Sequence, residues 1–180
     1  AGARRAGRER EAPPAACKTR GQAWGITSVS ARALRRQGYA PVIALLRAGR
    51  AGRGGGRIDH MLGLHRLWVL PQGAPASEGV YLQFPLQDLL NLLVLESWRH
   101  RCVVIGEDLG VVPDGIRQQL AARGVLGVDV LPFTRDASGF LPPAPRRRAA
   151  VPMPSTHHLP PLGGWPPRRA LRARARPGPA

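Results

Sequence analysis

The chain has 180 residues, and its 27 Lys and Arg against 11 Asp and Glu give a formal net charge of +16 at pH 7. Such an excess is typical of nucleic-acid-binding proteins, but 22 Gly and 19 Pro indicate that part of the chain lacks long ordered elements. No run of about 18 apolar residues suits a bilayer, and no signal segment is seen, so we expect a soluble cytoplasmic protein without a membrane partner. Cys17 and Cys102 have no metal-ligand spacing around them and are predicted to be free thiols.

The basic residues lie mainly in the two flanks of the sequence. Residues 1–57 hold 13 basic and 2 acidic side chains, residues 58–145 hold 6 and 9, and residues 146–180 hold 8 and none. The flanking arginines occur in strings rich in Ala, Gly and Pro, which are typical of disordered tails, and no aromatic residues alternate with them to stack on bases. We therefore predict disordered basic flanks at 1–20 and 166–180 and no nucleic-acid partner. A basic nucleic-acid binder remains the alternative.

The middle of the sequence alternates helices and strands. Apolar residues recur at helical spacing over 86–101, and Pro85 stands just before them, which predicts an amphipathic helix. The pattern places Glu96 on a polar face of this helix. The β-branched run 102–105, bounded by Gly106, predicts a strand that is buried on both faces.

A second helix and strand follow. The helix is predicted from Pro113 to Gly124, with Ile116 and Leu120 on its apolar side, and the strand over 128–133. Helices and strands that alternate with short connections favour parallel strands joined by crossover helices, which is an α/β fold.

Two carboxylates stand where such a fold gathers its functional groups. Glu107 follows the strand that ends at Ile105, and Asp59 lies in the segment 57–60 ahead of an apolar run. Because the carboxyl ends of parallel strands carry the functional groups, these two carboxylates are candidates to share one site. The pattern alone leaves open that each acid only caps the next helix.

Several short strings stand out by their order and spacing. They are GQAWG at 21–25, RIDHMLGLHRLW at 57–68, EGVY at 78–81, ES at 96–97, IGEDLGVVP at 105–113 and STHHLP at 155–160. In this order they resemble the amylomaltases, the 4-α-glucanotransferases of glycoside hydrolase family 77. The resemblance extends over residues 21–165.

The resemblance implies a retaining double displacement by two carboxylates. Asp59 matches the family's nucleophile, which forms a covalent glucosyl-enzyme, and Glu107 matches the general acid/base that protonates the departing oxygen. Arg57, two residues before Asp59 on a strand, would keep Asp59 ionised, and partial burial would keep Glu107 protonated. Carboxyl groups about 5–5.5 Å apart are expected for this route, against about 6.5–9.5 Å for inversion.

Family positions that bind the glucan also have matches here: Gln22, Trp24, Arg57, His60 and His157. Trp24 would offer an aromatic face to a glucose ring and Gln22 an amide to its hydroxyls. Without the resemblance, a core tryptophan beside a capping amide is an equal alternative. We expect linear α-1,4-glucans and malto-oligosaccharides as partners, and neither a cofactor nor a metal.

His158 is the main departure from the family pattern. It stands where the family has a third catalytic carboxylate that stabilises a positively charged transition state, and an imidazole supplies no negative charge. We therefore expect impaired transfer from the catalytic set Asp59, Glu107 and His158. Pro152 and Pro154 each remove a ladder donor from the strand before His158, which we expect to weaken that strand.

The expected fold is α/β, a partial (β/α)8 TIM barrel over residues 21–165 that forms the C-terminal portion of the catalytic barrel. A closed barrel takes about 250 residues, so this segment does not close one alone. The departures from the family pattern concentrate toward the ends of the chain and include Gly54–Gly56. A truncated or frame-shifted reading of the gene would produce such departures. Two alternatives to an active transferase stay open, a non-catalytic maltodextrin-binding remnant and a related retaining α-glucan hydrolase.

Overall fold

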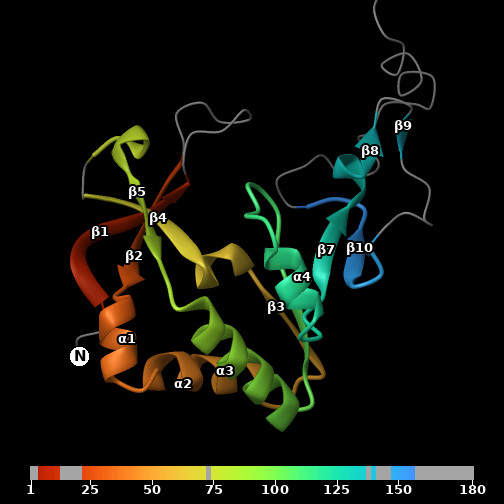
Figure 1. Cartoon of the computed structure of the whole chain (residues 1–180), viewed down its shortest axis with the longest axis horizontal. Helices are drawn as coiled ribbons and strands as arrows, with labels where there is room; N and C mark the ends of the chain where they lie inside the picture. Colours follow the sequence, from red (N-terminus) through yellow and green to blue (C-terminus); the bar gives the residue numbers. More distant parts are fainter. Residues whose placement is uncertain (1–3, 13–21, 72–73, 137–138, 141–146, 157–180) are drawn as a thin grey trace, which may run out of the picture. The chain divides into compact units, whose positions relative to one another are not determined.

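A computed structural model describes the following parts of the chain: residues 4–12, 22–71, 74–136, 139–140 and 147–156. The chain divides into two compact units, Ala1–Glu107 and Asp108–Ala180. Their helices and strands are labelled in Figure 1.

The elements of the two units follow one another in chain order. The first unit contains β1 Arg4–Ala12, β2 Gln22–Val29, α1 Ala31–Arg36, α2 Ala40–Arg50, β3 Gly55–Ile58, β4 Arg66–Pro71, β5 Val80–Gln83, α3 Leu86–Arg99 and β6 Val103–Gly106. The second contains α4 Ile116–Ala121, β7 Gly127–Val130, β8 Arg135–Asp136, β9 Gly139–Phe140 and β10 Ala150–Met153. Short 3-10 helices lie at Met61–Leu64 (η1), Ala76–Glu78 (η2) and Leu131–Phe133 (η3).

Four antiparallel strands of the first unit form a sheet in the order β2-β1-β4-β5. In β1, Glu9 lies opposite Thr27 on one side and Leu70 on the other. The disordered flank expected over 1–20 is therefore wrong for residues 4–12. Composition gave no sign of this strand because a central strand is held by main-chain hydrogen bonds to two neighbours, which any residue except proline makes.

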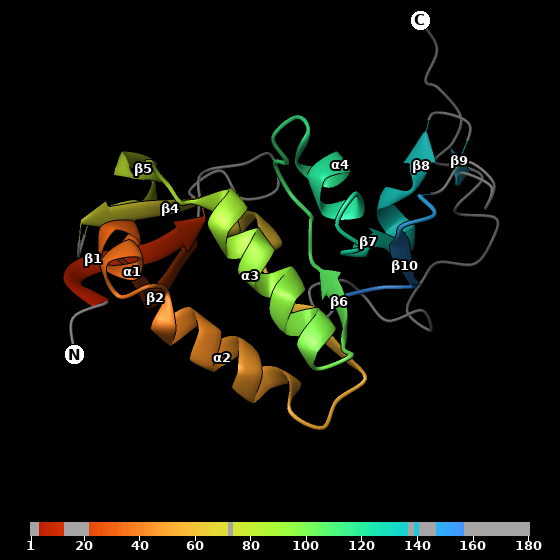
Figure 2. The ribbon, with the colours of Figure 1, turned by 60° about the horizontal axis from the view of Figure 1, so that its bottom comes forward.

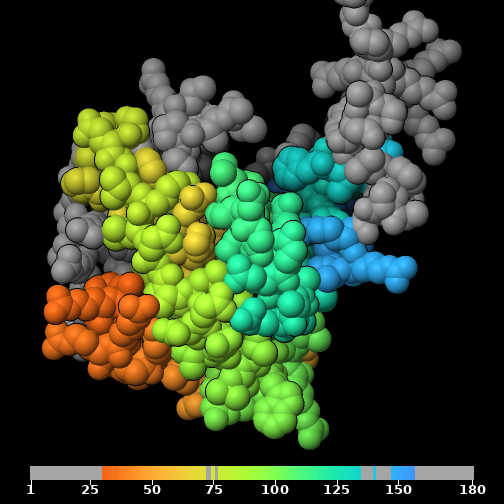
Figure 3. All heavy atoms as spheres, in the orientation of Figure 1, coloured from red at the N-terminus to blue at the C-terminus, as the bar shows by residue number. Residues whose placement is uncertain are grey.

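Three helices and the neighbouring strand β4 form the core of the first unit. Ser30 caps α1 by accepting a hydrogen bond from the N–H of Ala33 at 3.3 Å. The buried core cluster consists of Leu34, Leu67, Val69, Phe84 and Leu89. Figures 1 and 2 both show α2 beside α3, and the space-filling view shows the α1–α2 segment lying against α3 (Figure 3).

The helix predicted over 86–101 is confirmed as α3, which ends two residues earlier. Leu89, Leu90 and Leu93 are buried as the periodicity predicts. Glu96, expected on a polar face, is buried as well. The reason is that residues three and four positions apart share a helix face, so that Glu96 continues the row of Leu89 and Leu93.

The buried carboxylate of Glu96 is paired with two arginines. Arg47 of α2 lies 3.0 Å from it and Arg99 lies 2.8 Å from it, and the imidazole Nε2 of His100 lies 3.5 Å from it. The hydrogen bond from Arg47 is the largest influence on the Glu96 carboxyl and lowers its pKa to about 2. This ion-pair group links α2 to α3.

Strands β3 and β6 pair in parallel, with Ile58 opposite Gly106. The strand predicted over 102–105 is thus confirmed with a shift of one residue. Its burial on both faces is wrong, since Val104 is 3% exposed and Val103 is 52% exposed. Successive residues of a strand face opposite sides, and only one side of β6 is covered.

The second unit continues the predicted order of helix and strand. Helix α4 buries Ile116 and Leu120 as predicted. It begins later than expected because Gly115, with φ of +77°, forms a left-handed turn just before it. The strand predicted over 128–133 is shorter, since Pro132 already lies in η3.

Strand β10 pairs in parallel with β7, and the weakening expected from Pro152 is wrong for this pair. The N–H of Gly127 donates to the carbonyl of Ala149 at 2.8 Å. In a parallel strand, every second residue directs its main-chain N–H and C=O groups to the same neighbouring strand. Val151 directs these groups to β7, so the missing N–H of Pro152 lies on the side away from β7. Pro154 lies beyond the strand.

Candidate active site

Two carboxylates follow the paired ends of neighbouring parallel strands. Asp59 comes directly after β3, and Glu107 comes directly after β6. Because Ile58 and Gly106 are partners in the register, both acids leave the sheet at the same edge. Both acids therefore follow neighbouring parallel strands, as expected of functional groups in an α/β fold.

Main-chain groups of the turn after β3 hold Glu107 in place. The N–H of Glu107 donates to Ile58 O at 2.9 Å, and its carbonyl accepts from the N–H of Met61 at 2.8 Å. Its side-chain Oε2 accepts from the N–H of His60 at 2.8 Å. Glu107 is therefore oriented by three hydrogen bonds, one of which ends on the carboxylate itself.

A close packing contact supports the same turn. The side chain of Met61 is 2% exposed and lies across Gly106. A Cβ at Gly106 would lie 2.6 Å from Met61 Cε, 3.0 Å from its Cγ and 3.2 Å from its Cβ. Only glycine leaves room for this contact, which fixes the segment after Asp59 against the strand that precedes Glu107.

Asp59 is paired with Arg57 and remains accessible. The Arg57 Nη2 atom lies 2.7 Å from Asp59 Oδ1, and the Asp59 side chain is 73% exposed. The contact expected from their spacing on a strand is thus present. An exposed carboxylate held by a cation is available to an approaching ligand.

The remaining predicted site residues are described only in part. Gln22 and Trp24 lie in β2 by their main chain, and their side chains fall outside what the structure describes. His157 and His158 lie outside the described residues, as does Cys17. The structure therefore brings together Arg57, Asp59, His60 and Glu107.

Sequence reasoning did not find a buried ion-pair network around Asp108 in the second unit. Asp108 is 1% exposed, and its carboxylate accepts from the N–H of Val128 at 3.0 Å, from Arg117 Nε at 3.1 Å and from Arg147 Nη1 at 2.5 Å. Burial raises the pKa of this carboxyl, but the bonds from Arg147 and Val128 outweigh it and leave the pKa below its ordinary value. The only sequence signal is the position of Asp108 two residues after the end of β6.

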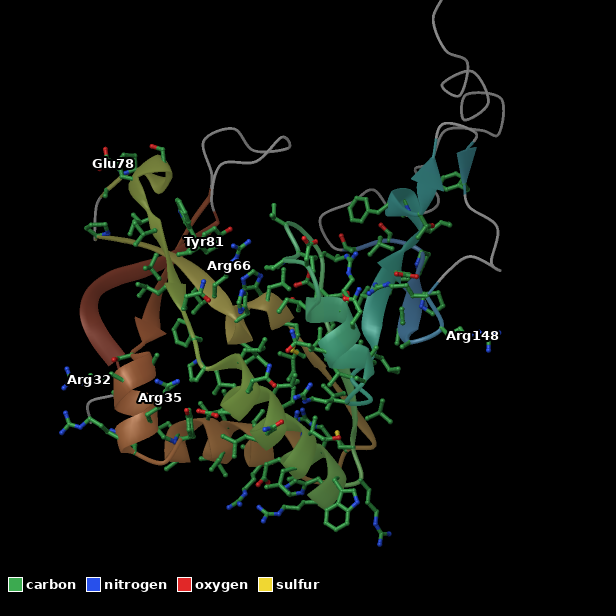
Figure 4. All side chains as sticks on the ribbon, viewed as in Figure 1. Arg32, Arg35, Arg66, Glu78, Tyr81 and Arg148 are labelled. Carbon is green, nitrogen blue, oxygen red and sulfur yellow. The ribbon has the colours of Figure 1, made fainter. Side chains whose placement is uncertain are left out.

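An aromatic pair with a cation stiffens the β4–β5 hairpin. Trp68 lies opposite Tyr81, and their ring centroids are 4.9 Å apart at an interplanar angle of 71°. Arg66 Cζ lies 4.1 Å from the Tyr81 centroid, and Figure 4 shows these two side chains next to each other. Edge-to-face and cation–π contacts of this kind stabilise a hairpin beyond their buried area.

Three further findings concern the part of the chain that the structure describes. There, no three or more His, Cys, Asp or Glu residues group together in a way that could hold a metal ion. No helix in that part combines the length and apolar character needed to span a membrane. Cys102 is a buried free thiol, as predicted.

Comparison with models of known protein families gives a match over most of the chain. A family model described as 4-alpha-glucanotransferase matches residues 4–176. The chain belongs to this family. The resemblance drawn from the sequence strings is confirmed, and the match extends beyond residues 21–165 at both ends.

Two relatives of this chain are much longer than it is. The 4-alpha-glucanotransferase of Mycobacterium tuberculosis is 38% identical over 159 residues, which cover 86% of this chain and 22% of the relative. That of Haemophilus influenzae is 37% identical over 151 residues, which cover 84% and 22%. The chain thus spans about a fifth of the length of these relatives.

Two solved amylomaltases have the same fold over most of the chain. The amylomaltase of Corynebacterium glutamicum superposes with a TM-score of 0.83 at 36% identity, over 87% of this chain and 23% of that protein. The amylomaltase of Streptococcus agalactiae in complex with acarbose gives 0.73 at 20% identity, over 83% and 31%. The second likeness supports the fold alone, and together they agree with the α/β class predicted from the sequence.

Proposed function

We propose that this chain carries the central part of a 4-alpha-glucanotransferase active site that transfers segments of α-1,4-glucan between maltodextrins. The observation that carries the proposal is the parallel β3–β6 pair, from whose matched ends Asp59 and Glu107 emerge side by side. Membership of the family supports the same assignment. We further propose that residues 21–165 form part of a (β/α)8 barrel.

In the proposed reaction, Asp59 is the nucleophile and Glu107 the general acid/base. Asp59 attacks the anomeric carbon as the glycosidic bond breaks, and Glu107 gives its proton to the departing 4-oxygen. The hydroxyl of an acceptor glucan then attacks the glucosyl-enzyme, gives its proton to Glu107 and releases Asp59. The Arg57 ion pair would hold the nucleophile in position before the attack.

Further residues are proposed to bind the glucan around the cleaved bond. His60 and Arg57 lie beside the two carboxylates in sequence and in the fold. Gln22, Trp24 and His157 are proposed as glucan contacts on their family match. His158 is proposed to occupy the position of the third carboxylate and to impair transfer, because a positive charge that develops on the sugar ring then lacks its counter-charge.

The experiment incubates the purified chain with maltotriose and separates the products by chromatography. Transfer produces both shorter and longer oligomers. We expect Asp59→Asn and Glu107→Gln to abolish it, His158→Asp to raise it, and the exposed control Asp114→Asn to leave it unchanged. Transfer that survives Asp59→Asn would refute the assigned nucleophile.

A non-catalytic maltodextrin-binding remnant is the second candidate, and His158 is the feature that favours it. This candidate predicts that maltotriose stays intact with the chain and with His158→Asp, while maltotriose binding is still seen by calorimetry. Glucose release without longer products would instead indicate hydrolysis, in which water resolves the intermediate.

A further inference from the structure

The buried ion-pair network of the second unit holds the residue that directly follows Glu107. Asp108 Oδ1 accepts from the N–H of Val128 at 3.0 Å, and Oδ2 accepts from Arg117 Nε at 3.1 Å. Arg147 donates to both of these oxygens. The main-chain carbonyl of Asp108 also accepts, from Arg117 Nη2 at 3.1 Å. Both the side chain and the main chain of Asp108 are therefore fixed within the second unit.

Stability alone explains this network poorly. Asp108 is 1% exposed, and taking a carboxylate out of water costs free energy that offsets much of its attraction to the arginines. Charge-assisted hydrogen bonds are directional, however, and so they fix the position of the group that they hold. The group that is fixed here is the immediate neighbour of the proposed acid/base.

Asp108 shares a planar peptide group with Glu107. The carbonyl of Glu107 belongs to this group and accepts from the N–H of Met61 at 2.8 Å. On its other side, the N–H of Glu107 donates to Ile58 O at 2.9 Å. Because the peptide group is rigid, a displacement of Asp108 tilts this group and moves the Cα from which the Glu107 side chain projects.

The Glu107 carboxylate is sensitive to such a movement. Its Oε2 accepts from the N–H of His60 at 2.8 Å. His60 follows Asp59 and has φ of +48°, a left-handed conformation that is uncommon for residues other than glycine. Hydrogen bonds weaken steeply when donor and acceptor lose their alignment, so the bond from His60 reports the position of the carboxylate.

We propose that Asp108 is a positioning residue for the transfer reaction, because its network holds the peptide group that aligns the Glu107 carboxylate with the His60 N–H. The inference rests on the proposed role of Glu107 as general acid/base. Asp108 is buried and acts through Glu107 rather than on the glucan. A reacting group that is misplaced by about 1 Å lowers the rate about a hundredfold, so an anchor beside the acid/base affects the reaction without contact to substrate.

The experiment compares three variants of the purified chain by amide hydrogen exchange, which NMR follows residue by residue. Asp108→Asn keeps the shape of the side chain but replaces one acceptor oxygen by an amide group that faces guanidinium groups. Arg117→Met removes the donors to Asp108 Oδ2 and O, and the Arg117 side chain is 45% exposed. Asp129→Asn is the matched control, because it removes the carboxylate 2.8 Å from Arg147 Nε and leaves Asp108 intact.

The quantity measured is the exchange rate of the His60 N–H relative to that of the Val103 N–H. The Val103 N–H donates to Gly54 O at 2.9 Å, at the opposite end of the β3–β6 pair. A network that only stabilises the fold changes the exchange of both amides alike through global unfolding. A positioning role increases the exchange of the His60 N–H alone.

We expect the ratio of the two rates to rise at least tenfold in Asp108→Asn and in Arg117→Met, and to stay unchanged in Asp129→Asn. In the maltotriose assay, Asp108→Asn is expected to lower kcat about a hundredfold with little change in KM. A ratio that is unchanged in Asp108→Asn and Arg117→Met, or that rises equally in Asp129→Asn, would overturn the positioning role. Transfer that survives Glu107→Gln would instead refute the assigned acid/base and leave the exchange ratios as measured. Each variant's circular dichroism spectrum verifies that it is folded.

Discussion

The packing of Met61 over Gly106 leads to a prediction about the geometry of the candidate site. The substitution Gly106→Ala adds one methyl group at a position where three Met61 atoms lie within 3.2 Å, the nearest at 2.6 Å. Rotation of the Met61 side chain can move Cε and Cγ away, but its Cβ is fixed to the main chain whose N–H bonds the carbonyl of Glu107. The new methyl therefore requires both a new Met61 side-chain conformation in the core and a small shift of this segment.

We expect Gly106→Ala to lower the free energy of unfolding by about 1–3 kcal/mol, the usual cost of overpacking a core. Gly56→Ala is the matched control, because Gly56 lies in the partner strand β3 and a Cβ there meets no atom within 4 Å. That control should be neutral or stabilising by about 0.4–1 kcal/mol, since alanine reduces the conformational freedom of the unfolded chain.

Urea unfolding followed by tryptophan fluorescence measures both variants, because Trp68 and Trp98 belong to the same unit as Gly106. The double variant Gly106→Ala with Met61→Ala completes a thermodynamic cycle, and its two changes should compensate each other by at least about 0.5 kcal/mol. Equal stability of Gly106→Ala and Gly56→Ala, or strictly additive effects in the cycle, would refute the reasoning.

Three further predictions concern the buried polar network, the core and the acid response. Asp108→Asn should lower the free energy of unfolding by about 1–3 kcal/mol, because it removes the charge of a buried carboxylate that accepts hydrogen bonds from the partly exposed Arg117 and Arg147, whereas the exposed Asp114→Asn should change the urea midpoint little. Leu90→Ala should lower the free energy of unfolding by about 2–5 kcal/mol, since Leu90 is fully buried. Leu95→Ala should lower it far less, because Leu95 is 40% exposed. The folded-state pKa of Glu96 is about 2, below its ordinary value of about 4.3. The ionised carboxylate should therefore stabilise the fold fully above about pH 4.3, and this effect should be lost as the pH falls toward 2. Melting temperatures measured from pH 2 to pH 5 should depend less on pH in Glu96→Gln than in the unchanged chain, and equal pH dependence would contradict this.

Local patterns accounted for the elements around the candidate site. The 3.6-residue period of 86–101 and the β-branched run at 102–105 are short-range signals, and α3 and β6 lie where they predict. The rule that functional groups follow parallel strands also brought Asp59 and Glu107 to one sheet edge. Short-range patterns could not reveal which strand pairs with which, so β1 escaped prediction within an arginine-rich segment.

The sequence by itself determined the family, the order of helices and strands in the middle of the chain, and the two acids of the candidate site. Each of these depends on residues that are close together in the sequence. Only the tertiary structure decided the environments of charged groups. It buried Glu96 between α2 and α3 and gave Asp108 its cations. Burial and long-range pairing depend on residues that are distant in sequence, and the cost of desolvating a charge depends on the partners that folding brings to it.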